Sequence, residues 1–257
     1  MKLFFSEYNP NYSKYNFPYQ VFAKREDKDL LGDLFSAGFL PTRINKDIFY
    51  LTRSSRINLA EFDLNSENRR INRKTEQFKF SLLPMSDFEY TPEVQKKSKD
   101  WFNERLGEKV LGALGIKTIY TESNNNYVFV WKLENEIVGY VVCLITESIL
   151  HYNFAFYNPD YYKDNLGVRM MLAAIEYAKE KELSYAYLGS VYEQGSMYKA
   201  QYKGFEFFNG ITWSANLDEL KYLINRPVGS EEYLWRDEQY LGNYVNVQSL
   251  KELFENL

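Results

Sequence analysis

Three consecutive strand-like segments followed by an amphipathic helix constrain the fold more than any other part of this sequence. Residues Tyr127 to Leu133, Ile137 to Thr146 and Ile149 to Phe156 are rich in β-branched and aromatic residues, and the turn Glu134-Asn135-Glu136 separates the first two. Short turns of this kind join antiparallel neighbours. From Leu166 to about Lys181, apolar residues recur on one helix face. The pattern predicts an antiparallel meander with a helix packed against it.

The segments that follow extend this pattern. A short strand is expected at Tyr185 to Leu188, strand pieces at Phe205 to Phe208 and Ile211 to Trp213, and a helix at Leu217 to Ile224. Three antiparallel strands, a helix, a strand, a short helix and a closing strand are the element order of the GNAT acyltransferase core, an order that many α+β domains share. We therefore predict an α+β fold whose GNAT-like acyltransferase core has a mixed, mostly antiparallel sheet flanked by helices.

The chain divides by pattern into three parts. Residues 1–90 predict a packed N-terminal α+β subdomain with a strand at Leu3 to Tyr8, a helix at Glu26 to Ala37, and strands at Ile48 to Leu51, Ile57 to Phe62 and Phe78 to Leu83. Residues 91–225 are predicted to form the GNAT-like catalytic domain. Residues 226–257 form an acidic C-terminal extension that can cap the core or bind a partner, with Glu231, Glu232, Asp237 and Glu238.

Composition excludes several classes of protein. The chain has one cysteine, Cys143, and one histidine, His151, so we expect neither an internal disulfide nor the usual Cys/His zinc or iron–sulfur site, and no metal. No apolar stretch approaches the ~20 residues that cross a bilayer, and no basic segment followed by a long apolar one opens the chain. We expect a cytoplasmic protein without a membrane partner.

Positive charge is concentrated in one segment. The formal net charge is −4, yet residues 53–79 carry seven Lys or Arg against four Asp or Glu, a local +3 that leaves −7 elsewhere. Within this segment Asn65 or Ser66 can cap a short helix, on which Arg69, Arg70, Arg73 and Lys74 share one face. Four such cations suit a phosphate backbone. The alternative, favoured on the residues alone, is a solvated basic surface.

Two further segments are candidates for chemistry. The loop Lys163 to Arg169 leads into the amphipathic helix, and a phosphate can bind at the N-terminus of a helix. Only Gly167 remains of the glycine-rich pattern that such loops have. Close packing explains Gly167 equally well. Tyr198, Lys199 and Tyr202 follow the strand that contains Tyr187. Their phenol and ammonium groups can stabilise an oxyanion or protonate a leaving oxygen. The alternative is that these three side chains lie on the surface of a short helix and have no role in catalysis.

His151 and Cys143 are interpreted as structural residues. Strict alternation places His151 on the strand face shared by Asn153, Ala155 and Tyr157. A lone strand histidine is more often structural than catalytic, and Cys143 lies within an apolar strand. With no second histidine, a Ser-His-Asp or Cys-His triad is not expected.

Taken together, these segments resemble the arginyl/leucyl-tRNA–protein transferases, which add an amino acid from aminoacyl-tRNA to the N-terminus of a protein. Order and spacing are similar over roughly residues 20 to 213. The segments that carry the resemblance are Leu34-Phe35-Ser36-Ala37-Gly38-Phe39, Tyr50, Arg56-Ile57-Asn58-Leu59-Ala60-Glu61-Phe62, Ser66, Asn68-Arg69-Arg70-Ile71 to Lys74, Phe156-Tyr157-Asn158-Pro159-Asp160, Leu166-Gly167-Val168, Ile175-Glu176-Tyr177-Ala178, Tyr187-Leu188-Gly189 and Tyr198-Lys199-Ala200-Gln201-Tyr202.

The resemblance implies an enzyme that forms an amide between an amino acid donated by aminoacyl-tRNA and an amine of a protein, peptide or small molecule. It implies a tRNA-contacting helix with Arg69, Arg70 and Arg73, and a cleft near Tyr198 and Lys199 that takes the aminoacyl ester. We further predict that Lys74 and Gly167 contact the tRNA and that Tyr187 and Tyr202 also line the cleft. Two alternative hypotheses for the function stay open: an acyl-CoA-dependent GNAT N-acyltransferase, and a catalytically silent GNAT-like binding module.

The sequence also departs from the family in three places. The family's clustered N-terminal cysteines, which bind an iron–sulfur cluster or zinc, are absent, so no such cofactor is expected. Glu193-Gln194-Gly195-Ser196-Met197 replaces a Cys-Pro-Lys-Met-like run before Tyr198. The residues after about Leu217 have no counterpart in the pattern.

Overall fold

The computed structural model describes residues 1–8, 10–14, 18–43, 45–107, 110–226, 233–245, 247 and 250–255. Most of the chain is organised around one eight-stranded sheet with the strand order β12-β11-β5-β10-β9-β8-β7-β6. Its strands are β5 (Ser54–Asn58), β6 (Phe78–Pro84), β7 (Tyr127–Leu133), β8 (Glu136–Ile145), β9 (Ile149–Tyr157), β10 (Tyr185–Ser190), β11 (Phe205–Phe208) and β12 (Trp213–Ser214). All neighbours are antiparallel except β9 and β10, which are parallel.

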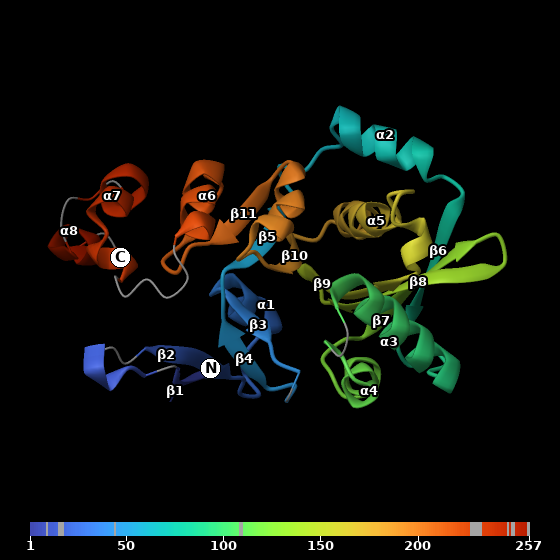
Figure 1. Cartoon of the computed structure of the whole chain (residues 1–257), viewed down its shortest axis with the longest axis horizontal. Helices are drawn as coiled ribbons and strands as arrows, with labels where there is room; N and C mark the ends of the chain where they lie inside the picture. The colour runs from blue at the N-terminus through green and yellow to red at the C-terminus, as the bar shows by residue number, and fades with distance from the viewer. Residues whose placement is uncertain are drawn as a thin grey trace.

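Helices cover both faces of this sheet, with α2 and α5 above it in Figure 1 and α1 and α4 below it. The helices are α1 (Leu31–Ser36), α2 (Ser66–Lys74), α3 (Pro92–Leu106), α4 (Ala113–Thr121), α5 (Leu166–Glu180) and α6 (Leu217–Asn225). One core cluster packs α2 and α5 on the upper face, and a second packs α3 and α4 on the other. The α+β class and the predicted order of strands and helices from β7 to β11 are confirmed.

A smaller four-stranded sheet lies below the main one, next to α1 (Figure 1). Its order is β1-β2-β4-β3, with β1 (Lys2–Glu7), β2 (Tyr19–Lys24), β3 (Phe39–Pro41) and β4 (Ile48–Leu51). A third core cluster joins this sheet and α1 to the lower face of the main sheet through Leu144, Ile149 and Tyr187. The turn after α1 is closely packed, because a Cβ on Gly38, whose φ is +86°, would lie 2.4 Å from the Phe208 ring.

The predicted boundary at residue 90 does not follow the division between the two sheets. β5 pairs with β10 and β11, and β6 pairs with β7, so both strands belong to the main sheet although they precede residue 90. The helix expected at Glu26 to Ala37 begins only at Leu31, because Asp29 forms a local turn with Glu26 instead. The helix α4 and the strands β2 and β3 were not predicted.

A β-bulge corrects the predicted orientation of His151. In the β8–β9 pairing, Cys143 lies opposite Tyr152 and Val142 lies opposite Phe154, so Asn153 is the extra residue. The bulge reverses the alternation along β9. His151 therefore shares a face with Phe154, not with Ala155 and Tyr157 as strict alternation required.

The C-terminal extension packs on the core through Tyr240, Leu241 and Val247. It contains η4 (Leu234–Arg236), α7 (Glu238–Tyr240), the π-helical turn η5 (Leu241–Val245) and α8 (Leu250–Glu255). Tyr240 is fully buried and donates a 2.6 Å hydrogen bond to Glu219 on α6, and Tyr222 donates to Asp237 at 2.7 Å. Glu231 and Glu232 lie outside the described residues. In the part of the chain that the structure describes, no helix has the length and apolar character needed to span a bilayer.

Candidate active site

Lys199 is a buried lysine without an acidic partner among the described residues. It lies on η3 (Gln194–Gln201), a 3₁₀ helix that follows β10, and its side chain is only 9% exposed. Its Nζ donates a 2.7 Å hydrogen bond to the carbonyl oxygen of Ser190, and no carboxylate among the described residues pairs with it. Burial lowers the pKa of Lys199 to about 8, so the neutral amine and the ammonium ion coexist slightly above neutral pH.

Lys199 lies near the point where β9 and β10 stop pairing. Their parallel pairing joins Tyr185 to Tyr187 with Ile149 to His151 and goes no further, although both strands continue. His151 is 2% exposed and packs edge-on against the Phe35 ring at 5.0 Å. Burial and the nearby charge of Lys199 lower the pKa of His151 to about 3, so the imidazole is neutral at physiological pH. Its Nδ1 has no hydrogen-bond partner among the described residues.

Tyr198 and Tyr202 do not share one helix face, although residues four apart would share a face on an α-helix. The segment η3 is a 3₁₀ helix that ends at Gln201, and Tyr202 has an extended backbone. Tyr202 is 2% exposed and its Oη lies 3.5 Å from the carbonyl oxygen of Val168, whereas Tyr198 is 47% exposed. Both phenols lie close to buried Tyr152 on β9, whose pKa is raised mainly by burial and also by these neighbours.

Arg105 extends this tyrosine group from α3. Its guanidinium lies 4.5 Å from the ring centroid of Tyr157, and its Nη2 donates a 3.1 Å hydrogen bond to the carbonyl oxygen of Ala155. This arginine was not identified from the sequence. The sequence offers one indication of where Arg105 lies: it follows Phe102 by three residues, so both share a face of the helix. In the structure the two side chains are in contact.

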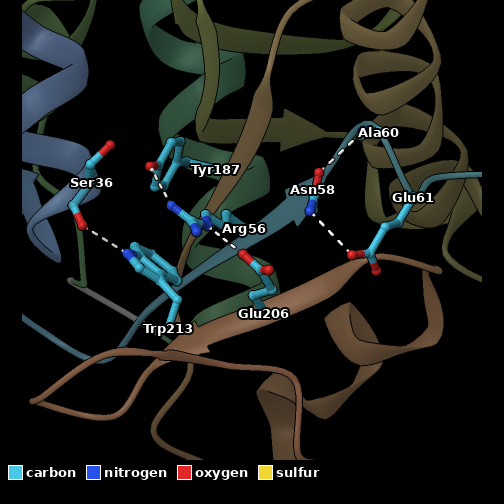
Figure 2. Close-up of polar contacts among 8 residues, drawn as sticks. All are labelled: Ser36, Arg56, Asn58, Ala60, Glu61, Tyr187, Glu206 and Trp213. Atoms are coloured by element: carbon cyan, nitrogen blue, oxygen red, sulfur yellow. Dashed lines mark hydrogen bonds and ion pairs between the residues drawn. The ribbon is translucent and has the colours of Figure 1, made fainter. Parts of the chain in front are cut away.

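Tyr187 belongs to a different cluster, which is shown in Figure 2. Its buried hydroxyl accepts a 3.3 Å hydrogen bond from Nη1 of Arg56, and Nε of Arg56 lies 2.6 Å from Oε2 of Glu206. The Arg56 guanidinium is stacked between the rings of Tyr185 and Trp213, 3.8 Å from each centroid. The structure therefore holds the Tyr187 hydroxyl on Arg56 and does not bring it together with Tyr198, Lys199 and Tyr202.

Gly167 lies in the first turn of α5, where close packing explains it. A Cβ at this position would lie 2.5 Å from Oη of Tyr157. The helix begins after Asn165, which adopts the left-handed conformation with φ of 62°. The contact with Tyr157 supports the packing interpretation, and phosphate binding at Gly167 stays a prediction.

The basic helix is present as α2, but its four cations are not equivalent. Asn65 caps it by accepting a hydrogen bond from the backbone of Asn68, as expected. The guanidinium of Arg69 donates to the carbonyl oxygen of Leu64, and that of Arg70 forms an exposed two-point ion pair with Glu67. Arg73 and Lys74 are exposed and form no ion pair with a described residue. These two remain available for an anion.

Specific polar contacts fix α2 relative to α5 and η3. Asn72 donates a 2.7 Å hydrogen bond to Glu176, and Nη1 of Arg169 donates to both Asn72 and Glu176 at 2.8 Å. Asn65 donates at 3.1 Å to the carbonyl oxygen of Gln201, the last residue of η3. The basic helix is thus attached to the helix that carries Lys199.

Cys143 is fully buried, and burial raises the pKa of its thiol. Among the described residues, no group of three or more His, Cys, Asp or Glu side chains lies in a metal-binding arrangement.

Comparison with known proteins gives this geometry a context. Residues 85–209 match the protein family described as "Arginine-tRNA-protein transferase, C terminus". The match covers just under half of the chain, 125 of its 257 residues. The matching segment contains His151, Gly167, Tyr198 and Lys199, and ends before α6. It does not contain the basic helix α2.

Curated relatives carry a related name. A protein named aspartate/glutamate leucyltransferase from Acinetobacter baumannii is 24% identical over 190 residues, covering 70% of this chain and 65% of that protein. Proteins of the same name from Ruegeria pomeroyi and Saccharophagus degradans are 32% identical over 99 residues (37% of this chain, 36% of that one) and 26% identical over 169 residues (62% and 69%). The chain thus spans about 65% of the length of the Acinetobacter relative.

Solved structures show weaker similarity. L-PGS from Bacillus licheniformis has a TM-score of 0.43 at 17% identity, covering 65% of this chain and 50% of that one. FemX has a TM-score of 0.42 at 12% identity, covering 67% and 62%.

Replacing Gly167 by alanine tests the packing interpretation. The new methyl group would collide with the ring of Tyr157, which is buried, so a shift of this ring disturbs the core and the free energy of unfolding in urea should fall by about 1–3 kcal/mol. Gly195→Ala is the matched control, because its Cβ would have no neighbour within 4 Å, and its effect should stay within about 0.5 kcal/mol. Equal, small effects of the two changes would contradict the interpretation.

The lowered pKa of Lys199 predicts a pH-dependent stability. Between about pH 8 and 10.5 the unfolded chain keeps a proton that folded Lys199 has lost, so the free energy of unfolding rises with pH across this window. The rise is of the order of 3 kcal/mol relative to a Lys199→Met variant, measured by urea denaturation at several pH values. Lys203→Met, at a lysine that is 62% exposed, is the control and should follow the wild type. A constant difference between wild type and Lys199→Met would contradict the assignment.

Proposed function

We propose that this protein is an aminoacyltransferase that moves an amino acid from aminoacyl-tRNA to the N-terminal amine of a protein or peptide. The match of residues 85–209 and the names of the relatives support this activity. The reaction belongs in the cytoplasm, where charged tRNA is made available for translation. We further propose that it proceeds without an iron–sulfur cluster or zinc.

The observation that carries the proposal is the buried amine of Lys199, which has no carboxylate partner among the described residues and a pKa near 8. In the reaction, the acceptor amine attacks the ester carbonyl carbon, a C–N bond forms, and the C–O bond to the ribose breaks. One proton must leave the attacking nitrogen and one must reach the ribose oxygen. A lysine that exists in both protonation states near neutral pH is suited to both transfers.

The phenols near Lys199 supply donors for the negative charge of the tetrahedral intermediate. Tyr198 is the exposed member of the pair on η3, and Tyr202 is the buried one that fixes η3 against the start of α5. We assign Tyr198 to the substrate and Tyr202 to positioning. Tyr187 has no part in this scheme, because Arg56 holds its hydroxyl.

The donor tRNA is proposed to lie along α2. Arg73 and Lys74 are the exposed cations without a described ion-pair partner, whereas Arg69 and Arg70 already have partners within the protein. Because Asn65 connects α2 to the end of η3, a phosphate bound on α2 is held at a fixed position relative to Lys199. The net charge of −4 does not prevent this contact, since local patches govern phosphate binding.

A transfer assay tests the activity. Incubation with a pool of tRNAs, each charged with a labelled amino acid, and peptides with different first residues should give labelled peptide. Lys199→Met should reduce the rate about 10²- to 10⁴-fold without loss of the folded state, because it removes the proton-transferring group. Lys203→Met, four residues away and exposed, should retain activity.

Other outcomes of this assay would replace the proposal. Label in no peptide with any charged tRNA would favour a silent binding module. Thermal stabilisation by acetyl-CoA, with none by charged tRNA, would favour the acyl-CoA-dependent alternative.

The role of α2 is tested by tRNA binding at several salt concentrations. An Arg73→Ala, Lys74→Ala double variant should weaken binding about equally for all tRNAs and reduce the slope of log affinity against log salt by about 2, because two phosphate contacts are lost. Lys96→Ala, Lys97→Ala is the control, since both lysines form ion pairs on α3. An unchanged slope in the α2 variant would show that the helix is a solvated surface.

A further inference from the structure

The strand β1 (Lys2–Glu7) forms a free edge of the small sheet. The sheet order is β1-β2-β4-β3, so β1 pairs with β2 on one side and with no described strand on the other. All six residues of β1 are exposed. The hairpin of β1 and β2 extends away from the main sheet at the lower left of Figure 1. The proposed function assigns no role to this strand.

The other edges of the two sheets are protected against pairing with another chain. β3 and β12 have only three and two residues, and β3 ends at Pro41. β6 carries the exposed charge of Lys79 and ends at Pro84. Short strands, lysines and prolines are common means of preventing association between sheet edges. By contrast, β1 pairs with β2 over six residues without a bulge, and Leu3-Phe4-Phe5 occupies its centre.

The apolar side chains of β1 have little cover. Ala23 and Val21 of β2 pack in the third core cluster, and the residues opposite them on β1 continue the same sheet face beyond that core. On the other face, the ring of Phe22 stacks on a β1 ring at a centroid distance of 5.3 Å. Three apolar side chains of β1 are between 40% and 62% exposed: Leu3, Phe4 and Phe5. Both faces of the strand therefore offer apolar surface to a neighbour.

The backbone groups of alternate residues point toward the free edge. The N–H of Tyr8 donates a 2.8 Å hydrogen bond to the carbonyl oxygen of Pro18, which continues the register of the β1–β2 pairing. Hydrogen-bonded pairs alternate along an antiparallel ladder, so the even-numbered residues of β1 bond to β2. The N–H and C=O groups of Leu3, Phe5 and Glu7 consequently face outward.

We propose that β1 is the interface of a twofold homodimer, in which it pairs antiparallel with β1 of a second copy. The two small sheets then form one continuous sheet. Directly opposite residues of an antiparallel pair lie on the same face, so odd-numbered residues must lie opposite odd-numbered ones. With Phe4 opposite Phe4 of the second copy, Leu3 lies opposite Phe5 of the second copy, and the outward-facing backbone groups bond to each other. This inference does not depend on the proposed function.

This register is more complementary than its neighbours. It places every apolar residue of the centre opposite an apolar residue, and it brings together the stacked rings of Phe4 and Phe22 from both copies. A shift by two residues in one direction places Leu3 opposite Glu7 and Phe4 opposite Ser6. A shift in the other direction places Phe4 opposite Lys2. The complementarity is that of β1 with itself, which favours a second copy over a strand of another protein.

Charge favours the antiparallel direction. Lys2 lies opposite Lys24 on β2, so one end of the edge is positive, and Glu7 lies at the other end. Antiparallel pairing places the two lysines of one copy near Glu7 of the other at each end, whereas parallel pairing would bring like charges together. One strand pair is small beside a standard interface of roughly 1,600 Å², so we expect a dissociation constant of the order of 1–100 μM.

Sedimentation equilibrium of the full-length protein, from about 1 to 200 μM, tests the dimer. The wild type should change from monomer to dimer across this range. Phe4→Glu and Phe4→Lys should each weaken dimerisation about 10-fold or more, because each places like charges opposite one another on the twofold axis. An equimolar mixture of the two variants should dimerise more strongly than either variant alone.

Phe80→Glu is the matched control. Phe80 lies on the edge strand β6 and is 38% exposed, close to the 40% of Phe4. This variant should dimerise as the wild type does. A thermal melt of each variant checks that it is folded.

Cross-linking tests the register. Phe4→Cys should form a disulfide between two copies under a mild oxidant, because residue 4 lies opposite itself in a non-hydrogen-bonded pair with Cα atoms about 4.5 Å apart. In Ser6→Cys the two thiols belong to residues roughly 14 Å apart along the ladder, so no covalent dimer should form. The native Cys143 is fully buried and does not compete.

Three results would overturn the proposal. One is a wild type that stays monomeric over the whole concentration range. Another is a dimer that persists unchanged in Phe4→Glu and Phe4→Lys, which would place the interface elsewhere. The third is cross-linking of Ser6→Cys but not of Phe4→Cys, which would contradict the pairing of β1 with itself at Phe4. Loss of the dimer in both Phe4 variants with recovery in their mixture supports it.

Discussion

The parallel pairing of β9 with β10 ends after three residues on each strand, and the site depends on that ending. Beyond it, β9 continues along β8 with the bulge at Asn153, while β10 continues along β5 with a bulge before Gly189. Beyond this point β9 stays paired with β8 and β10 stays paired with β5, but β9 and β10 no longer pair with each other. Backbone groups freed between them need other partners, and the Ser190 carbonyl finds one in the amine of Lys199.

Burial of that amine sets its chemistry. An ammonium ion loses hydration when it is buried, and one backbone carbonyl replaces only part of it, so the neutral form is favoured. A carboxylate beside Lys199 would stabilise the charged form and remove its value as a proton acceptor. The neutral, buried His151 adds no charge of its own. The same surroundings therefore cost folding stability below about pH 8 and supply a lysine that exchanges protons near neutral pH.

The sequence predicted most elements of the main sheet because β-branched runs and one strongly amphipathic helix carry their own period. The basic helix could also be predicted from local residues, because Asn65 caps its first turn and Ile71 is buried against the core. What local patterns could not predict depends on tertiary pairing. The bulge at Asn153 reversed the side of His151, and the 3₁₀ geometry of η3 separated Tyr198 from Tyr202. Arg56 forms an ion pair with Glu206, 150 residues away in the sequence, and donates to the hydroxyl of Tyr187. These contacts hold Tyr187 outside the site.

The two faces of the sheet have different roles in the resulting arrangement. Cations of α2 and the start of α5 lie on the upper face, whereas a cavity lined by Arg43, Tyr50 and Ile119 lies on the lower one, between the small sheet and α4. A continuous sheet would separate a ligand on one face from a ligand on the other. Where β9 and β10 part, η3 places Lys199 near His151, whose side chain points to the lower face, and Tyr202 near Tyr152, whose side chain points to the upper face. The separation of β9 from β10 therefore lets η3 contact side chains of both faces of the sheet, which continuous pairing of the two strands would keep apart.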